Sequence, residues 1–346
     1  MNSVKLRVVA AVIAAVFGAS VAATTASAGT HPAFCGHDQR NTPYAQYLCA
    51  DAGDLLDVRI GDVHPTQPSL GYDEVYYKLG RYTLGKDAIN KKFDDWCEAD
   101  GRIAAATVQP NARLDDPSSF TCTLPIGGET ASSIGAMKTV VIGPHGEPFL
   151  TDGHHTLTAF AETPDGGLDL HVRLRVLANL STLTRQDFWA AMKDHKWVWL
   201  RDPSGNPTTV NRLPTSVGLA SFQNDRYRGL LYFGRDIGYH QNDVPFQEFY
   251  WGSWLRDSLP TLTWDASDLA SYLAAVDAST HAMVAVPKTA VVNDGFTAAD
   301  LDAMTAWNDG QPANKGEFGK LSKPYSDAKP GKLAYALEYK RVHHLP

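Results

Sequence analysis

The segment 138–161 carries the clearest pattern of hydrophobic and polar positions in the chain. Residues 138–142 are rich in β-branched side chains, residues 143–146 hold the Gly and Pro of a tight turn, and residues 148–151 form a second short apolar run. Apolar residues then recur at helical spacing, at Leu157, Phe160 and Ala161. The pattern predicts a β-hairpin that leads through a glycine turn into a helix.

Other parts of the first half also have readable periodicity. Residues 168–176 alternate strictly between apolar and polar, which predicts a strand with one buried face. Residues 73–77 and 87–99 have helical character, and residues 109–128, rich in Pro, Asp, Ser and Gly, are expected to form a loop. The polar face of the predicted strand carries basic residues that could line a site or be solvated, namely His171, Arg173 and Arg175.

The second half has a different character. A capping-box-like start at residues 184–187 precedes a helix, and residues 265–276 and 297–307 are also expected to be capped helices. The densest aromatic cluster falls within residues 246–254. Mixed strands followed by helices predict an α+β fold, with a small mixed sheet and helices in residues 29–180 and a mainly helical, aromatic-rich region in residues 181–346 packed on it.

The N-terminus has the pattern of a secretory signal peptide. Lys5 and Arg7 precede the apolar run 8–23, and small residues at 26–28 suit cleavage after Ala28. The apolar run is short and rich in alanine, so a stable membrane anchor is not expected. The mature protein is therefore expected to be secreted or otherwise extracytoplasmic, with residues 1–28 removed.

Charge limits the class of partner. The full chain has a net charge of −7, which becomes −9 when Lys5 and Arg7 leave with the signal peptide. Because Lys and Arg supply most of the nonspecific affinity for nucleic acid, so acidic a chain is a poor general nucleic-acid binder. A local basic patch or a bound divalent metal could still overcome this.

The four cysteines all lie in the first half of the mature chain. An even number behind a signal peptide predicts two disulfides, and short separations favour the pairs Cys35 with Cys49 and Cys97 with Cys122. The sequence alone allows three connectivities. A four-cysteine zinc site is the rival, although these wide spacings lack the paired Cys-x-x-Cys clips of such sites.

The candidate chemistry is concentrated where the predicted glycine turn meets the helix. The turn contributes Asp152 and Gly153, and His154 and His155 fall in the first helical turn. Amides there lack intrahelical partners and the helix dipole adds positive charge, so an anion is the natural occupant. The histidines offer proton donors, or a base with a near-neutral pKa. The same residues would also suit an ordinary capped turn.

These residues carry a family resemblance. The hairpin with residues 152–155 resembles the phosphate-binding signature of the ParB/sulfiredoxin superfamily, and residues 58–68 resemble its first strand and Pro-x-Gln-Pro box. Residues 71–82 and 246–252 are similar to a narrower, secreted family of ParB-like nucleases. The resemblance implies a ParB/sulfiredoxin-like fold, a phosphate-binding loop that includes Gly153 and Thr156, and phosphodiester chemistry.

The sequence also departs from the superfamily. Thr156 stands where ParB and sulfiredoxin have the motif arginine, and Ser69 replaces the arginine after the ParB box. His154 takes the place of the sulfiredoxin cysteine, so repair of sulfinic acids is not expected. Basic residues that could supply the missing cation are Lys78, Arg81, Arg113, Arg228 and Arg235.

Two classes of function therefore follow from the sequence. The first is an exported hydrolase of phosphodiesters or nucleotides, in which His154, His155 and Asp152 are the catalytic candidates and Gly153, Thr156, Lys78 and Arg81 the phosphate-binding ones. The alternative is a noncatalytic module that binds a phosphorylated ligand or a protein partner. No metal site is assigned, because adjacent histidines are a weak ligand pair, but a divalent metal shared with Asp152, His145 or a distant carboxylate stays open.

Overall fold

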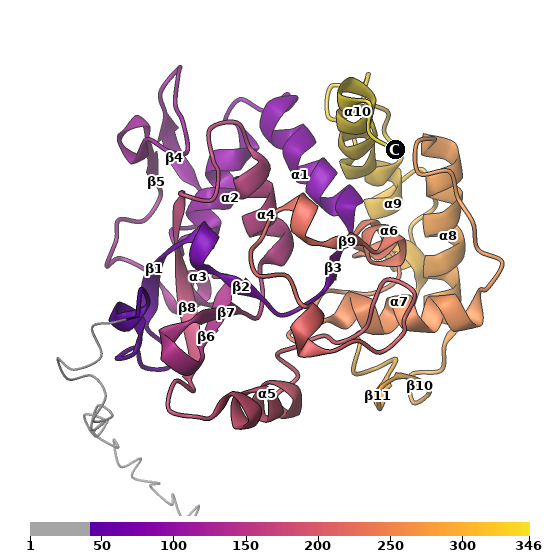
Figure 1. The fold of residues 1–346 in the computed structure, drawn as a ribbon. Coiled ribbons are helices and arrows are strands. Elements are labelled where there is room, and N and C mark those ends of the chain that lie inside the picture. Colours follow the sequence, from indigo (N-terminus) through magenta and orange to yellow (C-terminus); the bar gives the residue numbers. More distant parts are fainter. Residues whose placement is uncertain (1–41) are drawn as a thin grey trace, which may run out of the picture.

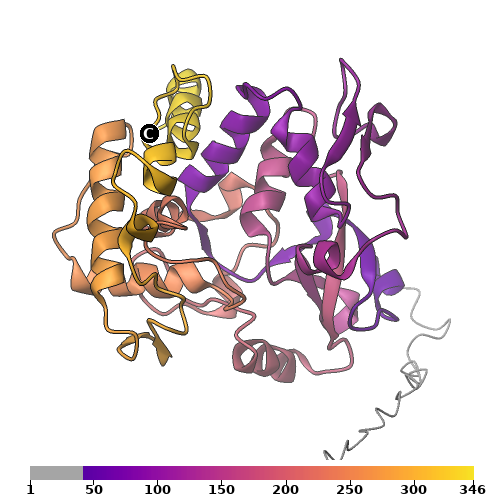
Figure 2. The same cartoon turned by 180° about the vertical axis from the view of Figure 1, so that it is seen from behind.

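The computed structural model describes residues 42–346, and its fold is α+β, as predicted (Figure 1). The expected signal peptide and Cys35, the expected partner of Cys49, lie outside the described residues. A five-stranded sheet with helices forms one side of the molecule, and a helical region forms the other (Figures 1 and 2).

The central sheet is mixed and has the strand order β1-β8-β6-β7-β2. β1 pairs with β8, and β6 with β7, in antiparallel fashion, whereas β6–β8 and β2–β7 are parallel. The strands are β1 (Leu55–Arg59), β2 (His64–Pro65), β6 (Thr139–Ile142), β7 (Pro148–Leu150) and β8 (His171–Asn179).

The sequence pattern located the centre of this sheet. The hairpin of β6 and β7 forms as predicted, and its turn needs Gly146, whose φ is +84°. β8 contains the predicted alternation, with Val172, Leu174 and Val176 buried, although the strand begins at His171 and continues to Asn179.

Helices cover both faces of the sheet. Val140 and Ile142 pack into a core with α1 (Tyr72–Thr83), α2 (Lys91–Ala99) and α4 (His154–Glu162). Val141, on the opposite face, packs against α5 (Arg185–Asp194), which begins at the predicted cap Thr184. The predicted helices near residues 73–77 and 87–99 therefore correspond to α1 and α2.

A disulfide-linked hairpin lies beside α2. β4 (Ala105–Val108) and β5 (Phe120–Cys122) pair antiparallel, and Cys122 is bonded to Cys97 of α2, as predicted. The expected loop at residues 109–128 was therefore partly wrong, because β5 forms within it by pairing with β4. This disulfide fits a protein that folds in an oxidising compartment outside the cytoplasm.

The second half is mainly helical. Its main helices are α6 (Arg226–Gly234), α7 (Gln247–Ser258), α8 (Leu269–Ala285), α9 (Gly316–Leu321) and α10 (Lys332–His343). Short elements complete the described chain: α3 (Ala131–Gly135), β3 (Ser69–Leu70), β9 (Gln223–Asn224), β10 (Val291–Asn293), β11 (Phe296–Thr297), and 3-10 turns at Ala45–Tyr47, Ile60–Asp62, Pro117–Ser119, Pro144–Gly146, Val210–Arg212, Leu219–Ser221 and Trp307–Gly310.

The helix expected at residues 297–307 was wrong. Thr297 does cap a turn by accepting from the amide of Asp300, but Asp302 adopts a positive φ of +45° and ends it. The following residue, Ala303, then forms a β-bridge with Tyr239. A capping signal is local, whereas this bridge joins residues 64 positions apart, so the tertiary contact overrides the local preference.

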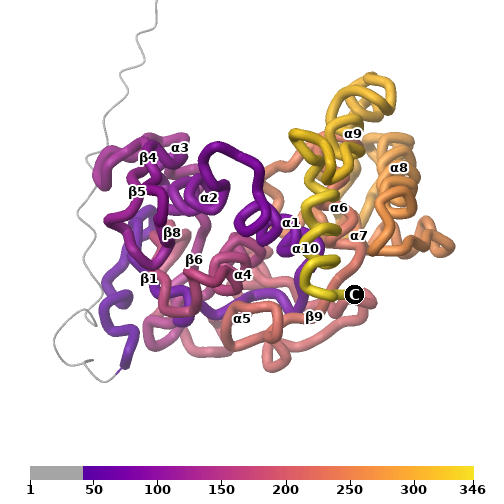
Figure 3. The backbone as a smooth tube through the Cα atoms, turned by 90° about the horizontal axis from the view of Figure 1, so that it is seen from above, coloured from indigo at the N-terminus to yellow at the C-terminus, as the bar shows by residue number. Residues whose placement is uncertain are grey.

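The two halves are joined by direct packing. α1 and α10 lie side by side between the sheet and α8 (Figure 3), and a Cβ added at Gly80 would stand 2.5 Å from the carbonyl oxygen of Tyr335. The buried Lys340 Nζ lies 3.2 Å from the carboxylate of Asp73, and β3 pairs with β9 in parallel. No helix within residues 42–346 is long and apolar enough to cross a membrane.

Candidate functional site

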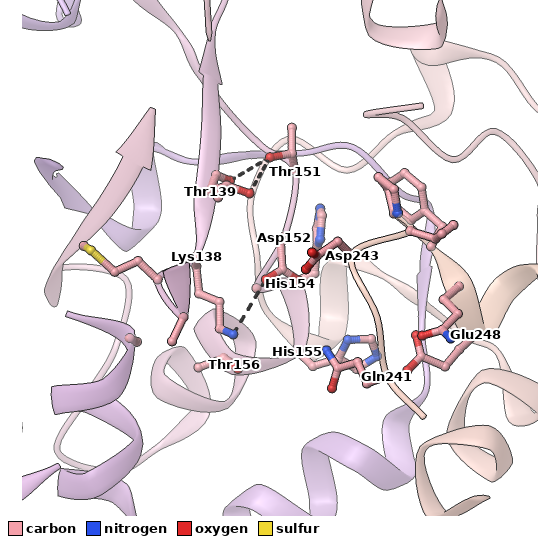
Figure 4. Close-up of a pocket in the computed structure, with 18 of the residues that line it drawn as sticks. Lys138, Thr139, Thr151, Asp152, His154, His155, Thr156, Gln241, Asp243 and Glu248 are labelled. Atoms are coloured by element: carbon pink, nitrogen blue, oxygen red, sulfur yellow. Dashed lines mark hydrogen bonds and ion pairs between the residues drawn. The ribbon is translucent and has the colours of Figure 1, made fainter. Parts of the chain in front are cut away.

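A cavity of about 740 Å³ opens where the sheet meets the second half. One wall comes from residues 135–139 and 151–156, which include the start of β6 and the first turn of α4. The opposite wall includes residues 241–249, which lead into α7, and Figure 4 shows Gln241, Asp243 and Glu248 on that side. The predicted glycine turn therefore lines this cavity.

Gly153 is the residue that precedes the first turn of α4. This residue adopts a φ of +102°, and a Cβ at this position would stand 2.6 Å from Cγ of Lys138. No side chain caps the helix, so the amides of His154, His155 and Thr156 lack both a cap and intrahelical acceptors. Such an N-terminus attracts an anion.

His154 is a buried, neutral imidazole. Its Nε2 accepts a hydrogen bond from the backbone N–H of Thr66 at 3.1 Å, so the ring proton resides on Nδ1. Burial, together with the positive charge of Arg228, lowers the pKa of His154 to about 3. This ring therefore connects α4 to the Pro-x-Gln-Pro box at residues 65–68.

His155 has the same kind of partner on the next segment. Its Nε2 accepts from the backbone N–H of Gly71 at 3.1 Å and lies 3.7 Å from the carboxylate of Glu74. Burial and the nearby Arg228 lower the pKa of His155 well below its ordinary value. The near-neutral base expected from the sequence is therefore absent at both histidines, since burial favours the neutral ring.

Asp152 and Lys138 form an ion pair beside the first turn of α4 (Figure 4). The Asp152 side chain is 65% exposed, and its carboxylate lies 3.6 Å from Lys138 Nζ. Beside them, the hydroxyls of Thr139 and Thr151 are 2.7 Å apart and link β6 to the end of β7. Asp152 is thus an accessible carboxylate, loosely paired and directly before Gly153.

The opposite wall contains a buried charge network. Arg228 Nη1 lies 2.8 Å from Glu74 Oε2, although the atoms are not aligned for a hydrogen bond, and Arg235 Nε donates to Glu248 Oε1 at 2.7 Å. Burial would raise the pKa of Glu248, but the adjacent Arg228 and Arg235 outweigh it and lower the pKa to about 2. Both arginines are therefore already neutralised by glutamates.

Comparison with known proteins places the chain in a family. A family model described as "Putative ParB-like nuclease" matches residues 56–257, more than half of the chain. The chain belongs to the ParB-like nuclease family. The matched span includes every segment that carried the resemblance, from the first strand to the aromatic residues 246–252. Membership in a family does not by itself establish a reaction.

Two further comparisons add little to this family assignment. Among solved structures, protein Atu1540 from Agrobacterium tumefaciens aligns at 20% identity and a TM-score of 0.45, over 67% of this chain and 93% of that one. No curated protein matches the chain.

Not all of the basic residues that the sequence suggested as phosphate ligands line the cavity. Lys78 lines the cavity and lies 3.5 Å from Asp95. Arg81 is not part of the cavity lining; its guanidinium pairs with Asp87 at 2.6 Å and lies over the ring of Tyr335. Arg113 is also outside the lining and pairs with Asp115. Thr156, at the position of the family motif arginine, lines the cavity with Gly153.

Sequence reasoning missed one basic residue of the cavity, Lys138, and named a second, Arg175, only as a residue that could line a site or be solvated. Both line the cavity, and the amide of Arg175 donates to the carbonyl of Lys138 at 2.9 Å. The alternation of β8 placed Arg173 and Arg175 on one face, but only the structure separates them, since Arg173 pairs with Glu129 at 2.6 Å and Arg175 does not. The sequence therefore indicated that Arg173 and Arg175 share a face, but it could not predict which of them pairs with a carboxylate.

The part of the chain that the structure describes contains no preformed metal site. Within residues 42–346, no group of three or more His, Cys, Asp or Glu side chains is arranged to hold a metal ion. His154 and His155 each use Nε2 for a backbone amide, so neither offers that nitrogen as a ligand. A metal requirement is therefore a matter for direct measurement.

Proposed function

We propose that this ParB-like protein binds the phosphate group of a phosphodiester or nucleotide at the first turn of α4 and hydrolyses the ester. The observation that carries the proposal is the uncapped N-terminus of α4, which opens into a cavity of about 740 Å³. Free amides at a helix N-terminus bind phosphate oxygens through both hydrogen bonds and the helix dipole.

Side chains around that turn supply further donors. Lys138 contributes an ammonium group, and Thr156 contributes a hydroxyl in place of a guanidinium. Because Nε2 of both histidines is an acceptor, their Nδ1 atoms carry protons and can donate to a bound anion without bearing a charge. In this proposal the histidines position and polarise the phosphate group, and they are not the base.

Asp152 is the proposed general base. Its carboxylate removes a proton from a water molecule, the water oxygen attacks phosphorus, and the bond from phosphorus to the leaving oxygen breaks. The leaving oxygen then takes a proton from solvent. The exposure of Asp152 and its loose pairing with Lys138 support this role, since the carboxylate is accessible to both water and substrate. A divalent metal at Asp152 would serve the same step.

Export supports hydrolysis over transfer. The proposed signal peptide at residues 1–28, cut after Ala28, and the Cys97–Cys122 disulfide both suit an extracytoplasmic protein. Outside the cytoplasm a nucleotide donor is scarce, whereas hydrolysis requires only substrate and water. N-terminal sequencing of the exported protein tests this part, because cleavage after Ala28 would leave Gly29 first.

One observation favours a second candidate function, a noncatalytic module that binds a phosphorylated ligand. Both histidines are committed to backbone amides, and burial keeps both neutral. A site without a histidine that titrates near neutrality can bind phosphate through amides and cations while lacking catalysis. The two candidates share the same anion site and differ only in turnover.

Turnover by the purified mature protein separates them. The panel contains single-stranded and duplex nucleic acids, nucleotides and small phosphodiesters, each with Mg²⁺, Mn²⁺, Zn²⁺ or a chelator. Asp152→Asn is the first variant, because its exposed side chain can change without disturbing the core. We expect it to lose about 10²- to 10⁴-fold in rate, as removal of a general base does.

Asp169→Asn is the matched control, since Asp169 is a highly exposed aspartate that pairs with Arg59 on the surface. It should retain full activity. Equal rates for wild type and Asp152→Asn would contradict the role of Asp152. A folded wild-type protein that binds phosphate esters but turns over none of them would support the binding module.

A further inference from the structure

Five lysine and arginine residues line the cavity, and they differ in whether a carboxylate pairs with them. Among the described residues, four of them have a carboxylate within 4.0 Å: Lys78 with Asp95, Lys138 with Asp152, Arg228 with Glu74, and Arg235 with Glu248. The fifth, Arg175 on β8, forms no ion pair with any carboxylate described here. No carboxylate within residues 42–346 compensates its charge by an ion pair.

The position of Arg175 makes this absence costly. Its Nε is buried and has no hydrogen-bond partner within residues 42–346. A buried donor on a charged group that lacks a partner destabilises the fold, and such groups are normally paired. Arg173, two residues earlier on the same face, has both Glu129 and Asp100 as partners, so the strand itself does not forbid pairing.

Arg175 also lines the cavity into which the first turn of α4 opens. Its backbone is paired with the start of β6, where Thr139 is its register partner and its amide donates to Lys138. The Lys138 side chain in turn packs over Gly153, at the first turn of α4. Arg175, Lys138 and the first turn of α4 therefore line the same cavity.

We propose that Arg175 is the guanidinium that binds the phosphate group of the ligand. The inference rests on the proposed function, because it assigns a residue to the same anion site. A guanidinium can bind two phosphate oxygens at once, which an ammonium group cannot do. Bound phosphate supplies the counter-ion that Arg175 lacks, whereas Arg228 and Arg235 would have to give up their glutamates to bind it.

The test uses inorganic phosphate and the full mature protein with its disulfide intact. Phosphate affinity is measured by calorimetry, and the melting temperature is measured with and without phosphate, for wild type, Arg175→Met, Arg175→Lys and Arg113→Gln. Arg113 is the matched control, because it is an arginine exposed outside the cavity. We expect Arg175→Met to weaken phosphate binding by about tenfold or more.

Stability without phosphate distinguishes ligand binding from a structural role. Removal of an unpaired charge whose Nε is buried should leave the melting temperature of Arg175→Met unchanged or higher. If Arg175→Met fails to fold, Arg175→Lys keeps the charge and is expected to fold while losing bidentate binding. Arg113→Gln should bind phosphate like wild type.

The outcomes also separate this inference from the proposed hydrolysis. Loss of phosphate affinity in the Arg175 variants supports the inference even if wild type turns over no ester. Unchanged affinity in folded Arg175→Met and Arg175→Lys overturns it, even if wild type is an active hydrolase. Absence of phosphate binding by wild type overturns it as well.

Discussion

The two walls of the cavity hold similar charges and use them differently. The wall formed by the sheet and α4, here called the sheet wall, carries Lys138, Asp152 and Arg175, which are loosely paired or unpaired. The helical wall carries Glu74, Arg228, Arg235 and Glu248, which neutralise one another while buried. The difference teaches that the number of arginines does not locate an anion site, because only cations without internal partners are available to a ligand.

The largest expected effect is the loss of stability when the buried charge network of the helical wall is disrupted. Glu248→Ala leaves Arg228 buried with Glu74 and removes the hydrogen-bonded partner of Arg235. Uncompensated buried charge should reduce the free energy of unfolding by about 3–5 kcal/mol, as measured by urea denaturation. Glu317→Gln is the control, since its surface pair with Lys320 should contribute less than about 1 kcal/mol. Equal losses in the two variants would remove the distinction between the walls.

Acid should affect the two walls in different pH ranges. The folded pKa of His154, about 3, lies below the ordinary 6.5, so the unfolded chain binds more protons and stability falls as pH drops from about 6.5 towards 3. The slope should approach about 1.4 kcal/mol per pH unit for each buried histidine. Glu248, with its pKa lowered to about 2 from 4.5, acts only below about pH 4.5.

Unfolding measured at a series of pH values tests this separation. His154→Gln should flatten the dependence between about pH 6.5 and 4.5, because it removes a histidine with a depressed pKa. His171→Gln, a change at an exposed histidine outside the cavity, is the control. A wild-type stability that is constant over this interval would show that the imidazoles are not buried as described.

A smaller effect is expected at the glycine turn of the sheet wall. Gly153→Ala places a Cβ on a residue with a positive φ and against Lys138. Gly205→Ala is the comparison, since Gly205 has a similar φ of +85°, but a Cβ there would meet open space. Both variants pay a backbone cost of about 1–2 kcal/mol, and Gly153→Ala should lose about 1 kcal/mol more. Chemical denaturation measures both, and indistinguishable losses would mean that Lys138 moves aside without cost.

The smallest expected change in stability is at Lys138 itself. Lys138→Gln removes a loose pair with an exposed carboxylate, so the free energy of unfolding should change by less than about 1 kcal/mol. Phosphate affinity should nevertheless fall severalfold, since the ammonium group lies at the proposed anion site. Lys193→Gln, at a lysine outside this cavity, provides the comparison. A strong loss of stability with unchanged affinity would assign Lys138 a structural role.

Short-range patterns in the sequence predicted the elements around the site. The hairpin of β6 and β7, the positive φ of Gly153 and the start of α4 at His154 depend on residues close together in the chain. The alternation of apolar and polar residues that predicted β8 is also a short-range pattern. The helix wrongly expected at residues 297–307 failed because the bridge between Ala303 and Tyr239 is a long-range contact.

The chemistry of the site depended on long-range contacts and was harder to predict. The sequence identified His154 and His155 but could not show that backbone amides of Thr66 and Gly71 occupy their Nε2 atoms. It offered Arg228 as a phosphate ligand, yet the partner that neutralises it, Glu74, lies 154 positions away. Arg175 was visible on a strand face, but its lack of a counter-ion is a property of the assembled fold.

The packing of α10 on α1 sets the timing of folding. α1 belongs to the first third of the chain, whereas α10 begins at Lys332, and the buried Asp73 has its countercharge only when Lys340 is in place. A nascent chain cannot complete this contact before α10 has been synthesised. A product truncated before α10 would leave an exposed helix face and an unpaired aspartate as targets for proteolysis.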